Sequence, residues 1–310
     1  MATNYVETPH NFEEIASYVT IEKKMILEKF YQSDKCFFYE TCSFRKHAQL
    51  SRPDYLFEYV KKHHGIFIIT RSVLMELASS SGVLNPEYVD YFRKISSAGI
   101  DILVIFEEDI YHIMDACFSA NEVINRYLTW AVRMVKHPTS TITETLKIHP
   151  VLYNEIMKSE TISDGSLYQR FFSAVRENKQ SKDNLGEEMI ALCLHILSNI
   201  ISEDDGKFCV ITEDKGAIGM IDSVFRKTHE QFRGKKIIIY STPKLVQHMY
   251  AEELISSLYD IEVMLQEGNG SSRLVILGTD VYDIKNREIS IECSELAQKM
   301  TIPNCIHIVY

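Results

Sequence analysis

Short runs of consecutive apolar residues alternate with longer stretches of helical periodicity along most of this chain. Five such runs lie at residues 35–41, 66–70, 101–106, 208–211 and 235–240. An uninterrupted apolar run of this length is typical of a strand that is buried on both faces, as in a parallel sheet. Because helix-like segments separate the runs, the pattern predicts an α/β fold with a mostly parallel sheet.

Two parts of the chain depart from this rhythm. Residues 110–184 have helical periodicity throughout, which predicts a helical insertion in the sheet domain. From about residue 261 the short apolar segments IEVML, RLVILG and ISIEC are separated by polar turns, which predicts the strands of a small mixed β module. SELAQKM predicts a short helix in this module, and IHIVY predicts a last strand.

The chain is therefore expected to have five parts. They are an N-terminal helical segment (1–34), the first part of the sheet domain (35–109), the helical insertion (110–184), the second part of the sheet domain (185–260) and the mixed β appendage (261–310). The spacing of apolar residues predicts one amphipathic helix over 11–32 and another over about 144–158.

The composition is that of an ordinary globular protein with an acidic surface. Of the 310 residues, 45% are hydrophobic and 25% are charged, and the formal net charge is −10. A chain this acidic is not expected to coat nucleic acid, because phosphate binding needs local cations. A nuclease whose acidic centre is filled by metal ions is compatible with this charge.

The cysteines and the apolar segments favour the cytoplasm. The seven cysteines form no CxxC pair, and most of them lie in apolar runs, as small core residues do in a reducing compartment. The start of the sequence has no basic region followed by an apolar stretch, so no secretory signal is expected. No apolar run approaches the roughly 20 residues that span a bilayer, so no membrane association is expected.

Acidic side chains recur where the predicted strands end or the following helices begin. In chain order they are Glu40, Glu76, Glu188 and Asp214. The carboxyl ends of parallel strands meet at one edge of a sheet, so these side chains are expected to converge there. Four neighbouring carboxylates do not all stay ionised without cations, and the ions that prefer oxygen ligands are Mg²⁺ or Mn²⁺. Such ions activate a water molecule and neutralise a scissile phosphate.

Neighbouring acids leave the membership of this cluster open. In the helix over 185–201, Glu188 lies at the edge of the apolar stripe and Glu187 points away from it, so helical geometry favours Glu188 as the third acid. The alternatives are Glu187 itself, Asp183 just before this helix, and Glu213 beside Asp214. The three acids at 107–109, after the third run, are typical of a solvated turn.

The order of these motifs resembles that of the PIN-domain family of metal-dependent ribonucleases. The motifs are Glu40-Thr41, Glu76 within LMELA, LGEE at 185–188 and ITEDK at 211–215. The resemblance covers about 35–255 and implies a three-layer PIN-like domain that hydrolyses RNA phosphodiester bonds. It also implies that Glu40, Glu76, Glu188 and Asp214 are both catalytic and metal-binding. The family's first acid is usually Asp, and Glu40 reaches one methylene further.

An RNA substrate also needs hydroxyl and cationic groups near the acids. The candidates are Thr41, Arg45, Lys46, Arg71, Thr212 and Lys215, of which Thr212 resembles the family's small hydroxyl residue beside the last acid. The alternative is a catalytically inactive PIN-like scaffold that binds RNA or protein. In either case the insertion or the C-terminal module would serve a protein partner or a homodimer. The chain has no GxGxxG, GxxxxGK[ST] or GxSxG motif, which argues against a nucleotide-binding fold or a serine hydrolase.

Overall fold

A computed structural model of the chain describes residues 8–78, 81–137, 140–159, 161–179, 183–231 and 234–310. Within these ranges the central element is a five-stranded sheet in which every neighbouring pair is parallel. Its order is β3-β2-β1-β4-β5. The strands are β1 (Lys35–Tyr39), β2 (Gly65–Thr70), β3 (Ile102–Ile105), β4 (Phe208–Ile211) and β5 (Ile238–Tyr240). The predicted α/β class is confirmed, and each of the five apolar runs contains one strand.

The core is centred on β1, which lies in the middle of the sheet. Phe38 pairs with Ile68 of β2 on one side and with Val210 of β4 on the other. From Cys36 to Tyr39 the strand has no exposed side chain surface. This complete burial explains why the strand is a continuous apolar run rather than an alternating one.

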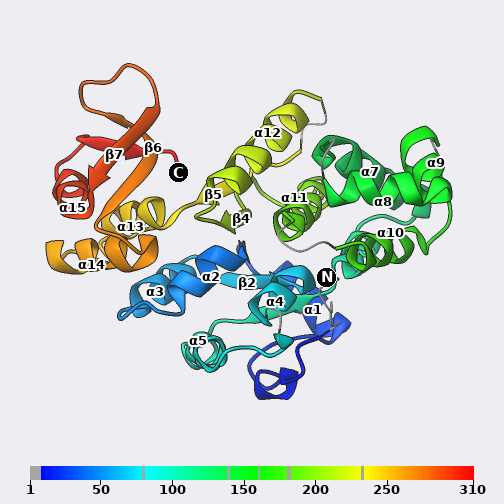
Figure 1. Cartoon of the computed structure of the whole chain (residues 1–310), viewed down its shortest axis with the longest axis horizontal. Coiled ribbons are helices and arrows are strands. Elements are labelled where there is room, and N and C mark those ends of the chain that lie inside the picture. Colours follow the sequence, from blue (N-terminus) through cyan, green and yellow to red (C-terminus); the bar gives the residue numbers. More distant parts are fainter. Residues whose placement is uncertain (1–7, 79–80, 138–139, 160, 180–182, 232–233) are drawn as a thin grey trace.

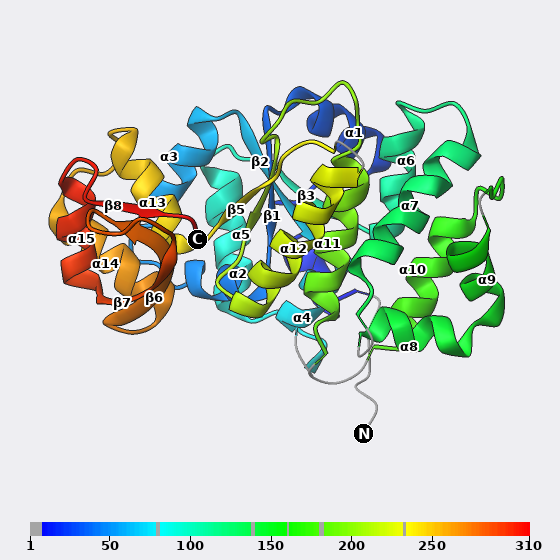
Figure 2. The same cartoon turned by 90° about the horizontal axis from the view of Figure 1, so that it is seen from above.

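Helices cover both faces of the sheet (Figures 1 and 2). One face is covered by α3 (Asp54–Lys62), α5 (Pro86–Ser97) and α13 (Thr242–Ala251). The other is covered by α11 (Leu185–Leu197) and α12 (Lys215–Gln231). Two short helices, α2 (Thr41–His47) and α4 (Arg71–Ala78), directly follow β1 and β2 and contact each other. Both helices therefore begin at the carboxyl edge of the sheet.

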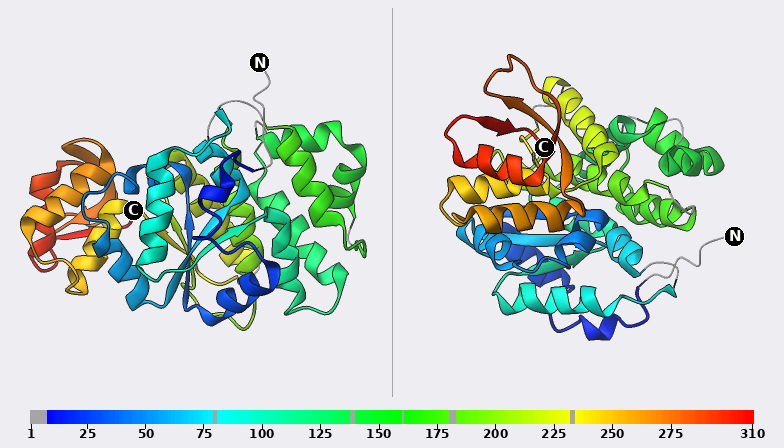
Figure 3. Two further views of the ribbon diagram at one scale, coloured as in Figure 1. Left: turned by 90° about the horizontal axis from the view of Figure 1, so that it is seen from below. Right: turned by 60° about the vertical axis from the view of Figure 1, so that its left-hand side comes forward.

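The insertion lies at one end of the molecule and is helical in its described residues (Figure 3). Its helices are α6 (Ile110–Asp115), α7 (Asn121–Val135), α8 (Thr141–Ile148), α9 (Pro150–Lys158) and α10 (Leu167–Glu177). The single helix expected over about 144–158 is two helices, because Pro150 disfavours the helical conformation of the residue before it. His149 accordingly has φ −118° and ψ 79°.

The C-terminal module lies at the opposite end (Figures 1 and 2). It consists of α14 (Leu258–Asn269), β6 (Arg273–Asp280), β7 (Arg287–Glu292), α15 (Cys293–Thr301) and β8 (Ile306–Ile308), and its antiparallel sheet has the order β7-β6-β8. The prediction that IEVML is a strand was wrong, since this segment lies within α14. Ile261, Met264 and Leu265 are buried at the spacing of one helical face, and the Ser257 side chain caps the helix.

The N-terminal segment also differs from the prediction. Instead of one helix over 11–32, it has a short 3-10 turn, η1 (Phe12–Glu14), and a separate helix, α1 (Lys23–Gln32). The Glu22 side chain accepts hydrogen bonds from two backbone N–H groups and so starts α1 at this point. Between the two elements, Thr20 forms a parallel bridge to Leu103 and extends the sheet at its β3 edge.

The three acids after β3 do not form a solvated turn. They make up a 3-10 turn, η3 (Glu107–Asp109), in which Glu107 is fully buried. Its carboxylate accepts hydrogen bonds from the Ser72 backbone N–H, at 2.8 Å, and from the Arg176 guanidinium, at 3.0 Å. These partners come from distant parts of the chain, so the pattern near residue 107 gives no sign of them. In the described ranges, no helix combines the length and apolar character needed to cross a membrane.

Candidate acidic site at the carboxyl edge of the sheet

The site lies where β1 and β4 end side by side. The Glu40 backbone N–H donates to the Ile211 carbonyl, at 3.1 Å, so the residues that follow the two strands start from neighbouring positions. Glu40 begins α2, and Asp214 immediately precedes α12. Helix α4 carries Glu76 and packs against both α2 and α11. Four elements therefore meet at this edge, and each contributes an acidic side chain.

Glu40 is buried and caps its own helix. Its carboxylate accepts hydrogen bonds from the backbone N–H groups of Cys42, at 2.8 Å, and Ser43, at 3.3 Å. Burial raises the pKa of Glu40, the two backbone hydrogen bonds oppose that rise, and the charge of Glu76 adds to it. The side chain thus stabilises the N-terminus of α2 while it contributes a carboxylate to the site.

Glu76 is fixed by contacts from three directions. One carboxylate oxygen accepts a hydrogen bond from the Thr41 hydroxyl, at 2.6 Å, and the other accepts from Lys179 Nζ, at 3.0 Å. Gly186 at the start of α11 lies so close that a Cβ there would be 2.7 Å from Glu76 Oε2. The backbone of α11 therefore approaches the carboxylate directly, which only glycine permits here.

The third acid of this group is Glu187, which is half-buried. Burial raises its pKa to about 7, and the charges of Glu76, Glu40 and Asp214 contribute to the rise. The cluster formed by Glu40, Glu76, Glu187 and Asp214 is called the acid cluster below. These side chains come from α2, α4, α11 and the β4–α12 junction and share one electrostatic environment.

Glu188, which helical geometry favoured, faces elsewhere. It is 5% exposed, its pKa is raised to about 7 mainly by burial, and the Ile142 backbone N–H of α8 opposes that rise. Its nearest charges are Asp183 and Lys179 rather than the other acids. The structure thus brings the alternative Glu187 into the cluster. The prediction assumed that a site acid borders the buried stripe of α11, whereas the cluster lies on the helix's more accessible side.

The residues before α12 hold Asp214 in place. Asp214 Oδ1 accepts a hydrogen bond from the Ala217 backbone N–H, at 2.8 Å, and its own N–H donates to the Thr212 hydroxyl, at 3.1 Å. Thr212 is fully buried, so it supports the turn from inside. Glu213 points toward α13, where the Thr242 hydroxyl donates to it at 2.6 Å. Burial raises the pKa of Glu213 to about 7 against the effect of these hydrogen bonds.

The cations predicted to bind substrate are distributed unevenly. The Arg45 side chain donates to the Glu76 carbonyl, at 2.5 Å, and Lys46 lies near Glu213, whose pKa its charge lowers. Arg71 is buried and stacks over the Phe106 ring, at 4.7 Å from its centroid. Lys215 is exposed and pairs with Glu288 of β7, at 3.3 Å. Of these cations Lys215 is exposed, Arg45 and Lys46 are half-buried, and Arg71 is buried.

Two further residues at the site escaped sequence reasoning. Lys179 bridges Glu76 and Asp183, with its Nζ 3.0 Å and 2.8 Å from their carboxylate oxygens. Cys42 is exposed as a residue, but its thiol is partly buried. This burial raises the pKa of the thiol to about 12, and the charges of Glu40, Asp214 and Glu187 add to the rise. Lys179 lies in a polar break after α10 that resembles a linker, so nothing in the local pattern indicates its role.

The donor chemistry of the acid cluster fits a hard divalent cation. All four side chains offer carboxylate oxygens, and burial, with a smaller contribution from neighbouring acids, raises the pKa of Glu40 and Glu187. Glu40, Glu76 and Asp214 are at present hydrogen-bonded within the protein. In the described ranges, no group of three or more His, Cys, Asp or Glu side chains is arranged to hold a metal ion.

A cavity of about 370 Å³ lies beside the acid cluster. Its lining includes Glu213 and Lys215 near the start of α12, and Arg273 and Val275 of β6. The C-terminal module thus contributes directly to the surroundings of the acidic site. Lys215 and Arg273 place two cations at this cavity, and each is paired with an acid of β7.

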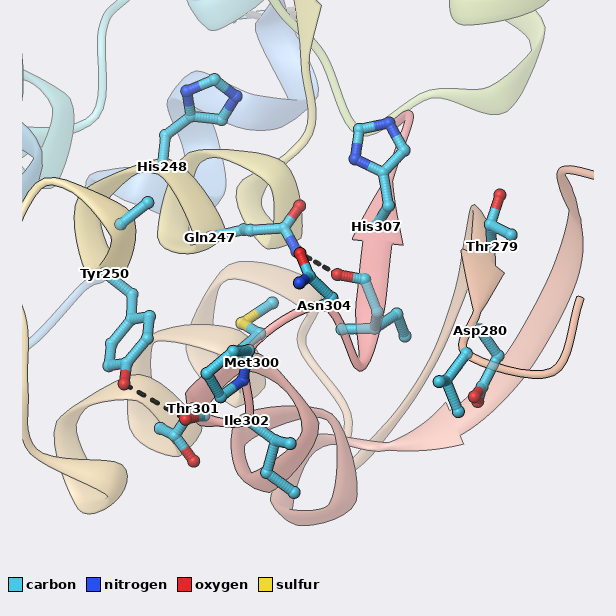
Figure 4. A pocket seen from close by; sticks show the side chains of 14 residues that line it. Gln247, His248, Tyr250, Thr279, Asp280, Met300, Thr301, Ile302, Asn304 and His307 are labelled. Atoms are coloured by element: carbon cyan, nitrogen blue, oxygen red, sulfur yellow. Dashed lines mark hydrogen bonds between the residues drawn. The ribbon is translucent and has the colours of Figure 1, made fainter.

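A second cavity of about 680 Å³ lies between α13 and the C-terminal module (Figure 4). Gln247 of α13 hydrogen-bonds to β8: its side chain donates to the Ile306 carbonyl, at 2.8 Å, and accepts from the Ile308 N–H, at 3.0 Å. In Figure 4, His248 projects from α13 and His307 from β8. Burial lowers the pKa of His248. The described residues that line this cavity include none of the predicted site residues.

Comparisons with known proteins identify no relative of this chain. No protein-family model, no curated protein and no solved structure matches the chain. A functional assignment therefore depends on the arrangement and chemistry of the site itself.

Proposed function

We propose that the chain is a metal-dependent ribonuclease that hydrolyses RNA phosphodiester bonds and uses Mg²⁺ or Mn²⁺ at the acid cluster. The observation that carries this proposal is the meeting of acid-bearing segments at one sheet edge: the ends of β1 and β4 are joined by the Glu40 N–H, and Glu76 is bonded by Thr41 and lies against Gly186, next to Glu187. Such a cluster is costly unless a cation balances it. The resemblance of the motif order to the PIN-domain family supports the same reading.

The chain's own groups suit this chemistry. A bound divalent cation would supply charge neutralisation at the scissile phosphate and would make a water molecule more acidic. Glu187 has a pKa near neutrality, so it can accept and release a proton at physiological pH. Thr41 orients Glu76, and the exposed Lys215 and the half-buried Lys46 would hold flanking phosphates.

The alternative is a PIN-like scaffold without catalytic activity that binds RNA or a protein partner. It is favoured by one observation: Glu40, Glu76 and Asp214 each serve the fold through hydrogen bonds within the protein. In this alternative Glu40 and Asp214 cap the helices that follow them, and Glu76 joins α4 to α2 through Thr41. The insertion or the C-terminal module would then be the binding surface for a partner or a second copy.

The deciding experiment is RNA cleavage by the purified protein with Mn²⁺, Mg²⁺ or EDTA. The key variants are Asp214→Asn, which keeps an oxygen for the Ala217 N–H, and Glu187→Gln. Glu188→Gln is the matched control, because it makes the same chemical change one residue away, outside the cluster. We expect metal-dependent cleavage that falls at least about 100-fold in the first two variants and less than about threefold in the control.

Three results would contradict the proposal. They are cleavage that persists in EDTA, equal losses in Glu187→Gln and Glu188→Gln, and the absence of cleavage across single-stranded and structured RNAs. If cleavage is absent while the protein retains RNA in a filter-binding assay, the scaffold becomes the better description.

A further inference from the structure

A chain of buried hydrogen bonds runs from the core of the sheet domain to Glu213. Its members are Tyr91 of α5, Tyr39 of β1, His47 of α2, Thr242 of α13 and Glu213 itself. The two tyrosine hydroxyl oxygens are 3.0 Å apart, and His47 Nε2 lies 2.8 Å from the Thr242 hydroxyl. The first four members are at most 1% exposed. Glu213 is thus held by contacts that solvent does not reach.

The donors of this chain all point toward Glu213. The Thr242 hydroxyl has one hydrogen and donates it to Glu213 Oε1, at 2.6 Å, so the hydrogen between His47 and Thr242 belongs to His47. Burial lowers the pKa of His47 to about 3, so its ring is neutral and its Nδ1 accepts from the Tyr39 hydroxyl. The Thr242 backbone N–H also donates to Glu213 Oε1. Oε1 therefore accepts two hydrogen bonds, whereas Oε2 accepts none from the residues that the structure describes.

Glu213 lines the cavity of about 370 Å³ beside the C-terminal module. This volume is in the range of small-molecule sites. The apolar part of the lining comes from three elements, and it includes Ile218 of α12, Pro243 of α13, and Val275 and Leu277 of β6. A carboxylate of fixed orientation beside aliphatic surface is the combination that orients a small ligand while its apolar part is buried.

The charges around this cavity leave one group without a counter-charge. Lys215 pairs with Glu288, at 3.3 Å, and Arg273 pairs with Glu292, at 3.5 Å. Within the described ranges, by contrast, no cationic side chain forms an ion pair with Glu213, and the charge of Lys46 acts on it only from a greater distance. The chain carries a formal net charge of −10, so its field attracts cations. A ligand that fits these features has a positive charge for Glu213 and an apolar body for the aliphatic lining.

We propose that this cavity binds a small primary amine, whose ammonium group donates to Glu213 Oε2 and whose apolar body packs against Ile218, Pro243 and Val275. The inference goes beyond the proposed function and does not depend on it, because it uses neither the acid cluster nor a metal ion. It assigns the C-terminal module a part in ligand binding, since β6 contributes to the lining.

The test is a titration with phenethylamine, followed by NMR through the methyl signals of isoleucine. Ile218 and Ile276 line the cavity, so their signals report binding there. At pH 8 both the amine and Glu213, whose pKa is about 7, are charged. We expect these signals to shift with a Kd below about 1 mM. 2-Phenylethanol and phenylacetate have the same apolar body without the positive charge, so they should bind at least about tenfold more weakly. Mg²⁺ alone should leave both signals unshifted.

Three variants test the site from different sides. Glu213→Gln keeps an acceptor for Thr242 and removes the charge, so we expect it to weaken amine binding at least about tenfold. Glu288→Gln is the matched control, because it removes a carboxylate of the same lining that is already paired with Lys215, and it should change the affinity less than about threefold. Gly219→Leu should abolish binding: Gly219 lines the cavity, and a Cβ there meets nothing within 4 Å, so the new side chain can enter the cavity without disturbing α12.

Several results would overturn the inference. They are the absence of shifts at Ile218 and Ile276 up to about 10 mM amine, equal binding of phenethylamine and 2-phenylethanol, and shifts produced by Mg²⁺ alone. Unchanged affinity in Glu213→Gln would do the same. The methyl spectrum of each variant shows whether it is folded, and amine binding that persists in folded Gly219→Leu would place the ligand elsewhere and contradict the proposed site.

Discussion

Glu187 and Glu188 follow each other in α11, and both have a pKa raised to about 7, but they have different charged neighbours. Burial is the largest cause in both. For Glu187 three carboxylates of other elements add to the rise, whereas for Glu188 Asp183 adds to it and Lys179 opposes it. One oxygen of Glu188 is buried and has no hydrogen-bond partner among the described residues. A cation at the acid cluster should therefore lower the pKa of Glu187 far more than that of Glu188.

The buried carboxyl group of Glu188 should make stability depend on pH. Its pKa is about 7 in the folded chain and near 4.5 when solvated, so the folded state holds a proton that the unfolded state releases between these values. The contribution is complete below about pH 4.5 and is lost as the pH rises through about 7. We expect Glu188→Gln to reduce the fall in unfolding free energy between pH 5 and pH 8 by on the order of 2 kcal/mol.

Urea unfolding of the wild type and this variant at the two pH values measures that difference. Glu144→Gln is the control, because Glu144 is exposed on α8 and pairs with Lys147. The same pH dependence in the wild type and in Glu188→Gln would show that Glu188 does not bind the proton.

At the scale of elements, the start of α11 shows how closely a helix can approach a site. Gly186→Ala would place a methyl group 2.7 Å from Glu76 Oε2, which is held by Thr41. We expect this steric conflict to exceed the gain in helix propensity and to lower the unfolding free energy by about 1 kcal/mol. Gly219→Ala in α12 is the matched control, with nothing within 4 Å of the added Cβ, and should raise it by about 0.5–1 kcal/mol.

Thermal or urea unfolding of both glycine variants gives the comparison directly. A gain in stability in both would mean that Glu76 moves aside at little cost, and the contact between α11 and Glu76 would then be loose.

The elements of the sheet could be predicted from sequence because burial on both faces leaves a local pattern. The run over 36–39 and FCVI over 208–211 have no polar residue, and both became inner strands. By contrast, IEVML is compatible with strand and helix alike, and its burial in α14 is decided by neighbouring elements. Local pattern also placed Glu40 and Asp214 at the correct edge of the sheet.

The remaining parts of the site depend on contacts between distant segments. Lys179 reaches Glu76 across more than 100 residues, and Glu107 is matched by Arg176 rather than by water. Neither pairing leaves a periodic signal in the sequence. The position of Glu187 rather than Glu188 beside the other acids could not be predicted for a related reason, since it required knowing which side of α11 faces them.

At the scale of the whole molecule, the sheet domain lies between the helical insertion and the C-terminal module (Figure 3). The insertion is joined to the sheet by Arg176, which is 5% exposed and pairs with the fully buried Glu107. We expect Arg176→Ala to lower the unfolding free energy by about 3–5 kcal/mol, because it leaves a buried carboxylate without its cation. Arg170→Ala, which breaks more exposed ion pairs of the same helix, should cost less than about 1 kcal/mol.

Urea unfolding again provides the measurement, and amide hydrogen exchange would locate the loss of protection. Exchange that accelerates only within α10 would contradict a role for Arg176 in joining the insertion to the sheet.

The pairing of β1 with β4 also has a consequence for the order of folding during synthesis. Phe38 is made early and pairs with Ile68 soon afterwards, but its partner on the other side is Val210. Until β4 leaves the ribosome, β1 is an apolar strand with one unsatisfied edge, which is the kind of surface that recruits other chains. We expect ribosome-stalled chains that end near residue 200 to be protease-sensitive and chaperone-bound. Chains long enough to expose β4 and β5 should be protected, and equal sensitivity at both lengths would show that the first three strands are stable without them.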